Sequence, residues 1–225
     1  MNKVYFQIGT YNGNDLFRDM VKKEKPNLII LVEPNKNVIN DIKKNYNNIE
    51  NVYIYNNAVF YNNDEEVELF IPSKNGSYGL ISDNGNYGLI SDNGIRYRDS
   101  QFSLLPMNDW GSKDDMIKLK SKSITFDKIC SNHNITNIDY LQIDTEGFDS
   151  EIIKMIDFSK YKIKTIRFEQ WNFTTHSFTR YNKEKSNELG ENGMKNSINK
   201  LIKYNYKITT VSDKMGDDYI AVLKD

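Results

Sequence analysis

The stretch Leu28-Ile29-Ile30-Leu31-Val32, followed at once by Glu33-Pro34-Asn35, decides the fold of this sequence. Five consecutive branched apolar residues are typical of a strand that is buried on both faces, as in a parallel sheet with helices on either side. Such a strand needs parallel neighbours, and parallel strands are usually joined through helices. The flanking sequence should therefore contain further short strands that alternate with amphipathic helices.

The sequence on either side supplies these elements. Apolar runs at residues 4–8 and 52–55 predict two neighbouring strands. Between the strands, apolar side chains recur at helical intervals over residues 16–21 and 38–46. Three strands with two intervening helices predict a doubly wound α/β sheet.

The same alternation returns in the second half of the chain. Thr125 is a suitable N-cap for a short helix that starts at Phe126. The other expected elements are strands at 117–120, 138–143, 163–168, 206–211 and 219–223 and helices from 149 and over 194–204. The last two strands are separated by a short turn and should form an antiparallel hairpin. We therefore expect an α/β fold with a mostly parallel seven-stranded sheet and a C-terminal antiparallel hairpin.

An insertion separates the two halves. Residues 58–61 and 67–71 predict a β-pair around the turn Asn62-Asn63-Asp64. The segment from about 73 to 123 is polar and rich in Gly, Asn, Asp and Ser. No composition shift marks a second domain, so we expect a single domain over residues 1–225 that carries this polar insertion.

The insertion contains a direct repeat. The sequence of Tyr78–Gly85 recurs nine residues later as Tyr87–Gly94. One unit copied once is too short for a solenoid, which needs several stacked repeats. The repeat is either a duplication tolerated in a surface loop or part of a longer lid over the substrate.

The composition excludes several classes of protein. The 30 Lys and Arg residues nearly balance the 31 Asp and Glu residues, which removes the basic excess that nucleic-acid binding normally needs. The single cysteine, Cys130, excludes a disulfide framework and is expected as a small core residue on a helix. The longest apolar runs have five residues, whereas a membrane span needs about 20. With no signal peptide visible after Met1, we expect a soluble, cytoplasmic protein without a membrane partner.

In an open parallel sheet, ligands bind at the carboxyl ends of the strands. After the first strand, Gly9 and Gly13 form a G-x-x-x-G pattern, in which glycine permits a tight turn and close approach to a ligand. Glu33 follows the second strand, where a carboxylate accepts hydrogen bonds from both hydroxyls of a ribose or interacts with a helix dipole. After the third strand, Asn57 and Ala58 could face an adenine edge.

Acidic residues gather after the fourth and fifth strands. Asp144, Glu146 and Asp149 place three carboxylates within six residues, and they would repel one another if all were buried and ionised. They therefore need a cation, hydrogen-bond donors or a proton. Asp149 can be an ordinary first-turn acid of a helix, but that explanation does not extend to both Asp144 and Glu146. Glu169 adds a carboxylate after the fifth strand.

Together these motifs resemble the FkbM-type methyltransferases. The main motif is Asp139-Tyr140-Leu141-Gln142-Ile143-Asp144-Thr145-Glu146-Gly147-Phe148-Asp149, and its most specific part is Ile143–Phe148 between a strand and a helix. The order and spacing of the other motifs support it: Ile8–Gly13, Val32–Asn35, Asn57–Val59 and Ile124–Asp127. The family comprises S-adenosylmethionine-dependent O-methyltransferases with the Rossmann-like fold of class I methyltransferases. The resemblance therefore implies that fold, that cofactor and that reaction.

The resemblance also implies roles for single residues. The cofactor-binding set that it implies is Gly9, Thr10, Gly13, Asn14, Glu33, Pro34, Asn57, Ala58 and Asp144. The first four would line the methionine moiety, Glu33 would hold the ribose hydroxyls, and Asp144 would lie beside the sulfonium and the acceptor. The family usually has an acid two residues before the first glycine, where this sequence has Gln7, and we expect a weaker contact to the cofactor's amino group there.

We therefore expect methylation of a hydroxyl on a sugar, a glycan or a related small molecule. Such a hydroxyl is a poor nucleophile at neutral pH, so the reaction calls for a carboxylate base: Asp144 or Glu146, with Glu169 as the third candidate. The crowded acids could also bind Mg²⁺.

Three other functions stay open at this point. One is a catalytically silent protein that binds S-adenosylmethionine. The second is an RNA ribose O-methyltransferase, which the balanced charge disfavours. The third is a nicotinamide-dependent oxidoreductase, which the absence of a third glycine in the first turn disfavours.

Overall fold

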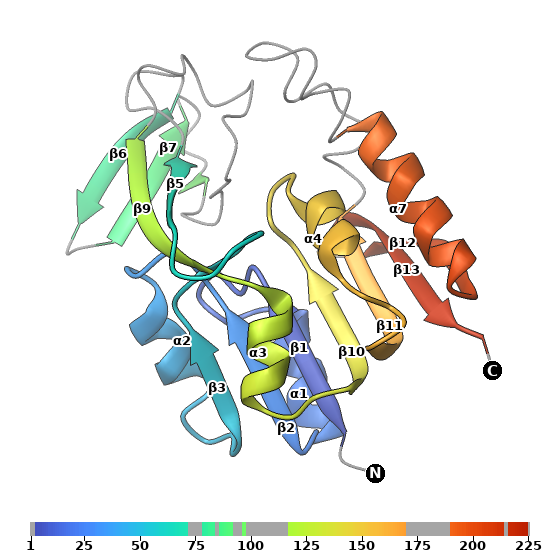
Figure 1. Cartoon of the computed structure of the whole chain (residues 1–225). Coiled ribbons are helices and arrows are strands. Elements are labelled where there is room, and N and C mark those ends of the chain that lie inside the picture. The colour runs from blue at the N-terminus through green and yellow to red at the C-terminus, as the bar shows by residue number, and fades with distance from the viewer. Residues whose placement is uncertain are drawn as a thin grey trace.

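The computed structural model describes residues 3–71, 78–83, 86–91, 96–97, 117–169, 190–213 and 216–224. A seven-stranded sheet with the order β12-β13-β11-β10-β1-β2-β3 forms the centre (Figure 1). Its strands are β1 (Val4–Ile8), β2 (Leu28–Val32), β3 (Val52–Tyr55), β10 (Asn137–Ile143), β11 (Lys162–Glu169), β12 (Tyr206–Asp213) and β13 (Gly216–Leu223). This is a mainly parallel seven-stranded α/β sheet, as the sequence predicts.

The direction in which strands are added changes once. From β1 the chain adds β2 and β3 on one side, and then β10 and β11 on the other, all of them parallel. β13 runs antiparallel between β11 and β12, which confirms the predicted C-terminal hairpin. The strand order therefore reverses between β1 and β10, and this is where an open sheet of this kind binds its ligands.

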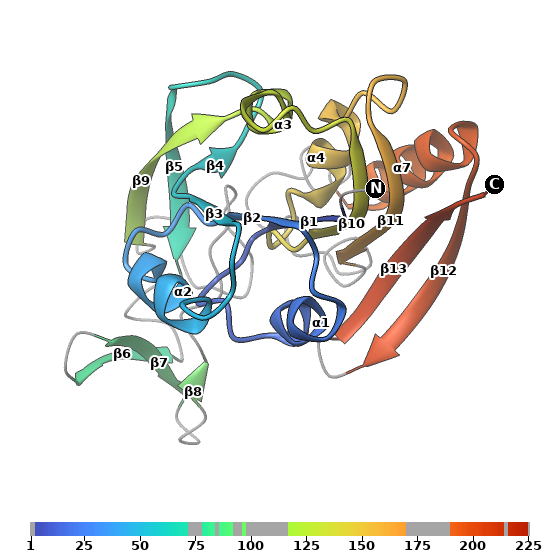
Figure 2. The same ribbon diagram turned by 90° about the horizontal axis from the view of Figure 1, so that it is seen from below.

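Helices cover both faces of the sheet (Figure 2). The helices are α1 (Leu16–Glu24) and α2 (Ile39–Asn45) on one face, and α3 (Phe126–Asn132), α4 (Asp149–Met155) and α7 (Glu191–Lys203) on the other. In β2, Ile29 and Leu31 belong to the core cluster under α1 and α2, whereas Ile30 and Val32 belong to the cluster under α3, α4 and α7. Because successive side chains of β2 point into the two core clusters in turn, every residue of the strand has to be apolar.

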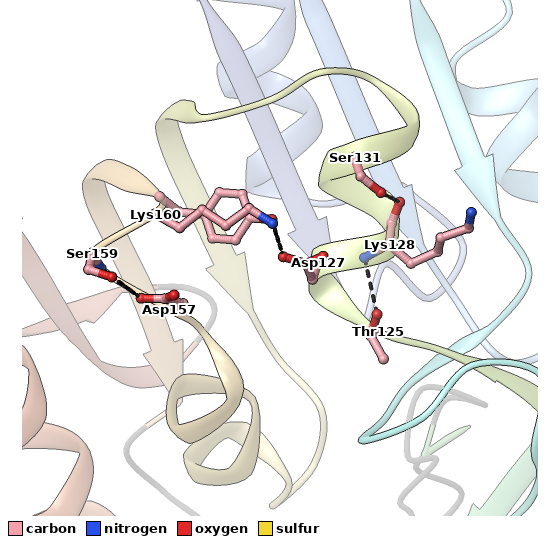
Figure 3. Close-up of polar contacts among 8 residues, drawn as sticks. Thr125, Asp127, Lys128, Ser131, Asp157, Ser159 and Lys160 are labelled. Atoms are coloured by element: carbon pink, nitrogen blue, oxygen red, sulfur yellow. Dashed lines mark hydrogen bonds and ion pairs between the residues drawn. The ribbon is translucent and has the colours of Figure 1, made fainter.

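Side-chain contacts connect helix α3 to the loop that follows α4 (Figure 3). Thr125 caps α3, because its Oγ1 accepts a hydrogen bond from the Lys128 amide at 3.0 Å, as the sequence predicts. Asp127 accepts hydrogen bonds from the Lys160 ammonium and from the Tyr161 hydroxyl, the latter at 2.6 Å. Cys130 is fully buried on this helix, which confirms its expected place in the core.

One predicted pairing is wrong. We expected residues 58–61 and 67–71 to pair with each other, but β4 (Ala58–Val59) and β5 (Glu66–Ile71) both pair with β9 (Ile117–Ile124) instead. β9 runs parallel to β4 and antiparallel to β5, so it lies between them. The short turn between β4 and β5 suggested a hairpin, and the distant strand that separates them gave no local signal.

The direct repeat forms a structure of its own. β6 (Tyr78–Asp83) pairs antiparallel with β7 (Asn86–Ser91), and β7 pairs with the short β8 (Arg96–Tyr97). The first copy of the repeat is therefore hydrogen-bonded to the second, with Leu80 opposite Leu89. Within the segment expected to be a polar loop, these described parts are strands.

Candidate active site

A cavity of about 610 Å³ opens at the carboxyl ends of the central strands, beside the reversal of strand order. Its lining comes from the turns after β1, β2 and β10, from the ends of β11 and β13, and from β4 and β5. The volume suits a small molecule or a cofactor. The lining includes most of the residues that the sequence indicated: Gly9, Asn14, Glu33, Pro34, Asn57, Ala58, Asp144, Glu146 and Glu169.

Gly9 lies where the ends of three strands meet. Its φ is +83°, and a Cβ placed on it would lie 1.7 Å from the carbonyl oxygen of Asp144. Any side chain would therefore push β1 and β10 apart. The amides of Gly9 and Thr10 both donate to the Val32 carbonyl, at 2.9 and 3.2 Å, and this ties the end of β2 to the same point.

Thr10 and Gly13 lie outside the cavity lining. Thr10 is buried, and its hydroxyl donates to the Val32 carbonyl at 3.4 Å. A Cβ on Gly13, where φ is +70°, would lie 2.9 Å from Cε2 of Tyr46 in the turn after α2. In this structure the second glycine of the G-x-x-x-G pattern makes room for Tyr46, and it forms no part of the cavity wall.

Glu33 is a buried carboxylate at the end of β2. Its two oxygens accept hydrogen bonds from the Tyr11 amide at 2.7 Å and from the Asn35 amide at 2.8 Å. Tyr11 makes its contact with φ at +49°, a conformation that costs a non-glycine residue some free energy. Burial raises the pKa of Glu33 to about 7, although both amide donors act in the opposite direction.

Two asparagines after β3 contact neighbouring segments. The side-chain amide of Asn56 donates to the carbonyls of Glu33 and Pro34, at 2.8 and 3.1 Å. This fixes the backbone next to the Glu33 carboxylate, a contact that the sequence did not suggest. The Asn57 side chain lines the cavity and donates to the Lys122 carbonyl of β9 at 3.2 Å.

Asp15 is a cavity residue that the sequence reasoning missed. One of its oxygens caps α1 by accepting from the Arg18 amide at 3.0 Å, and the other accepts from Nε2 of Gln7 at 2.6 Å. Gln7 itself is buried and does not line the cavity. The carboxylate on this side of the cavity is therefore that of Asp15. An acid just before a helical pattern was a signal for it, but that signal also describes any N-cap.

Asp144, Glu146 and Glu169 all line the cavity, and Asp218 of β13 joins them. Burial raises the pKa of Asp144 well above its usual range, and the carboxylates of Glu146, Asp149, Asp218 and Asp15 raise it further. Asp218 is paired with Arg167, whose Nε lies 2.6 Å from its carboxylate.

The turn that carries Asp144 and Glu146 has an unusual backbone. Glu146 has φ at +52° and Gly147 has φ at +103°, so two successive residues adopt left-handed conformations. Glycine tolerates this without cost, whereas glutamate does not. The surrounding structure must hold Glu146 in place. Strained residues of this kind are concentrated at functional sites.

Comparison of the sequence with known families shows which family the chain belongs to. Residues 7–208 match the methyltransferase FkbM domain. The chain belongs to the FkbM methyltransferase family. The match extends from β1 into β12, so it includes every segment that lines the cavity up to the end of β11. Membership makes the protein a methyltransferase and implies S-adenosylmethionine as the methyl donor.

Several solved structures are similar to this FkbM-family methyltransferase at low sequence identity. A precorrin-6y C5,15-methyltransferase from Geobacter metallireducens GS-15 aligns with TM-score 0.42 and 10% identity, over 98% of this chain and 78% of its own. A fibrillarin pre-rRNA processing protein from Methanococcus jannaschii aligns with TM-score 0.41 and 10% identity, over 99% and 66%. The methyltransferase domain of bacterial CtHen1 aligns with TM-score 0.43 and 11% identity, over 100% and 90%. No curated protein sequence matches the chain.

Two further observations concern metals and membranes. Among the described residues of this FkbM-family chain, no three His, Cys, Asp or Glu side chains are grouped so that they could hold a metal ion. The possible Mg²⁺ site thus finds no support in that part of the chain. None of the helices that the structure describes is long and apolar enough to cross a membrane.

The contact at Gly9 predicts unequal effects of alanine at the two glycines. Gly9→Ala forces a methyl group into the Asp144 carbonyl and should destabilise the fold by at least about 3 kcal/mol. Gly13→Ala meets the edge of a side-chain ring and should cost about 1–2 kcal/mol, mainly through its positive φ. Urea denaturation measures both. Equal losses of unfolding free energy in the two variants would show that the contact of Gly9 with Asp144 is no tighter than that of Gly13 with Tyr46.

Burial of Glu33 predicts a pH-dependent stability. Between pH 4.5 and about 7 the folded protein keeps Glu33 protonated while the unfolded chain ionises it, so the unfolded state binds fewer protons. As the pH rises through this window, the wild type should lose at most about 3 kcal/mol of unfolding free energy relative to Glu33→Gln. Denaturation of both proteins at pH 5, 6, 7 and 8 measures the difference, and a constant difference would contradict the raised pKa.

Proposed function

We propose that the protein is an S-adenosylmethionine-dependent O-methyltransferase acting on a hydroxyl of a sugar, a glycan or a related small molecule. The observation that carries this proposal is that Glu33 and Asp144, the ends of the two strands beside β1, line one cavity in a chain of this family. We further propose that residues 1–225 form a single methyltransferase domain.

The residues of the cavity suit the cofactor. S-adenosylmethionine supplies a methyl group on a positively charged sulfur, which makes the methyl carbon electrophilic. Both Glu33 oxygens are oriented by backbone amides and retain lone pairs for two ribose hydroxyls. Asp15 offers a carboxylate for the amino group of the methionine moiety and so takes the part that Gln7 leaves open. Asn14 would border the same moiety, while Pro34, Asn57 and Ala58 would border the adenine.

Asp144 is our candidate for the general base. It lies at the carboxyl end of β10, directly beside the reversal of strand order, and lines the cavity. Its raised pKa makes it a better proton acceptor than an exposed aspartate, and therefore suited to take a proton from a hydroxyl. Glu146 and Glu169 lie at the same cavity and are the second and third candidates. The rest of the site aligns the acceptor with the methyl group.

The charge of the cavity bears on the acceptor. Seven carboxylates line it, those of Asp15, Asp19, Glu33, Asp144, Glu146, Glu169 and Asp218. Among the described lining residues there is no Lys, Arg or His. A phosphate-bearing acceptor would find no basic side chain on these described walls, which speaks against RNA ribose methylation. A neutral hydroxyl compound needs no such side chain.

The role of Asp144 can be tested by substitution. Asp144→Asn removes the proton acceptor and should lower kcat by about 10²–10⁴-fold. Calorimetry should still show binding of S-adenosylhomocysteine within a few-fold of the wild type. Asp139→Asn is a matched control on the same strand, because Asp139 accepts from the Val4 amide at 2.9 Å and does not line the cavity. Near-normal turnover of Asp144→Asn would remove Asp144 from the mechanism, and a wild type that binds the cofactor but methylates no acceptor would favour the silent protein.

The acidic walls predict a preference against charged acceptors. A methyl glycoside that serves as an acceptor should have a kcat/KM at least tenfold higher than its phosphate ester, because the ester carries its charge among carboxylates. Raising the salt concentration should reduce the difference in kcat/KM between the two compounds, because salt screens the repulsion. The measurement is transfer of a labelled methyl group to each compound. Faster transfer to the phosphate ester would contradict the assignment of neutral acceptors.

A further inference from the structure

Asp149, the first residue of α4, is an acidic side chain that is buried but does not line the cavity. Its carboxylate accepts three hydrogen bonds. Oδ1 accepts from the Thr145 amide at 2.9 Å and from the Thr145 hydroxyl, and Oδ2 accepts from the Glu169 amide at 3.0 Å. One side chain therefore joins the turn after β10 to the end of β11.

The two segments that Asp149 joins carry the candidate bases. Thr145 stands between Asp144 and Glu146, and the Glu169 amide belongs to the third candidate itself. We propose that Asp149 is a positioning residue for methyl transfer, which holds Asp144, Glu146 and Glu169 at one cavity through its contacts with Thr145 and Glu169. The proposal rests on the function proposed above.

These contacts differ from those of an ordinary helix-terminal acid. An exposed acid in the first turn interacts with the helix dipole and with water. Glu151, in the same turn of α4, is also buried, but its carboxylate pairs with Lys154 of the same helix at 3.2 Å. Asp149 instead accepts hydrogen bonds from the turn after β10 and from the end of β11. Its hydrogen bonds also hold the turn in which Glu146 has its positive φ.

Replacement of Asp149 by asparagine breaks this arrangement without changing its size. Asparagine has one acceptor oxygen, so it can keep the Thr145 contacts or the Glu169 contact, and its amide hydrogens oppose the donor on the other side. A buried amide that is left without an acceptor is costly, so one of the two segments should shift.

The same substitution removes a charge from a crowded group. The carboxylates of Glu146, Asp149, Asp218 and Asp15 act on Asp144, and Asp218 in turn faces Arg167 and acts on Asp149. Asp149→Asn takes away one of the negative charges that raise the pKa of Asp144, so the pKa of Asp144 should fall. Because a general base acts when deprotonated, the acid limb of the pH profile of kcat should move to lower pH.

The experiment compares four variants with the wild type. Asp149→Asn should lower kcat at least tenfold, leave the affinity for S-adenosylhomocysteine within twofold, and move the acid limb of kcat to lower pH. Thr145→Val, which lacks the hydroxyl donor, should also lower kcat, whereas Thr145→Ser should restore it. Glu151→Gln is the control on the same helix turn and should keep the wild-type kcat and pH profile.

Hydrogen exchange supplies a measurement that does not depend on activity. In Asp149→Asn the amide of Thr145 or of Glu169 should exchange faster than in the wild type, while the amides at the start of β10 should not. Unchanged exchange at both positions, or unchanged kcat and pH profile in an active enzyme, would overturn the proposal. If Asp149→Asn fails to fold, the two Thr145 variants test the proposal instead. The proposal then requires a low kcat in Thr145→Val and a restored kcat in Thr145→Ser, which keeps the hydroxyl. A wild type without methyl transfer would contradict the proposed function alone, and exchange would still decide whether Asp149 holds the two segments.

Discussion

The close approach of two backbone segments, at Gly9 and Asp144, is the constraint on which the candidate site depends. Because no side chain stands between them, β1 and β10 remain neighbours to the last residue of each strand. The amides that follow β1 then reach the Val32 carbonyl and bring the end of β2 alongside. Glu33 and Asp144, which are far apart in the sequence, thereby come to line one cavity.

Acidic side chains are gathered in and beside the cavity at a cost to the folded state. Burial raises the pKa of Glu33, Asp144 and Asp149, which means that folding opposes the ionisation of each of them. Backbone amides offset part of that cost at Glu33 and Asp149, whereas other carboxylates add to it at Asp144. Perturbed acids grouped at the carboxyl ends of the strands are the pattern expected of a catalytic site.

Sequence reasoning recovered the central sheet because its evidence is local. The buried run 28–32, the helical spacing after it and the turn signals between strands each depend on neighbouring residues. It failed for β4 and β5, because the strand that lies between them comes from more than forty residues further along the chain. It also left Asp149 among ordinary helix acids, since nothing nearby in the sequence reveals that Glu169 donates to it.

The candidate site was recovered in the same uneven way. Residues at strand ends, such as Glu33 and Asp144, follow from the rule that ligands bind there. Residues whose place in the site depends on a tertiary contact cannot be found by that rule. Asp15 was missed because its link to the site is the hydrogen bond that it accepts from the side-chain amide of Gln7. We propose that Asp15, eight residues from Gln7, supplies the acid that the family pattern has at position 7.

The pairing of the two repeat copies has a consequence for how this segment arose. A duplicated stretch that forms a strand brings its own partner, because the second copy can fold back on the first. The sequence between the two strands is Asn84-Gly85, the dipeptide that best supports a tight hairpin, and it belongs to the repeated unit itself. A single replication error can thus add a hydrogen-bonded hairpin in one step, without new pairing demands on the host sheet. Tandem duplication is in this case a route to new secondary structure as well as to extra length.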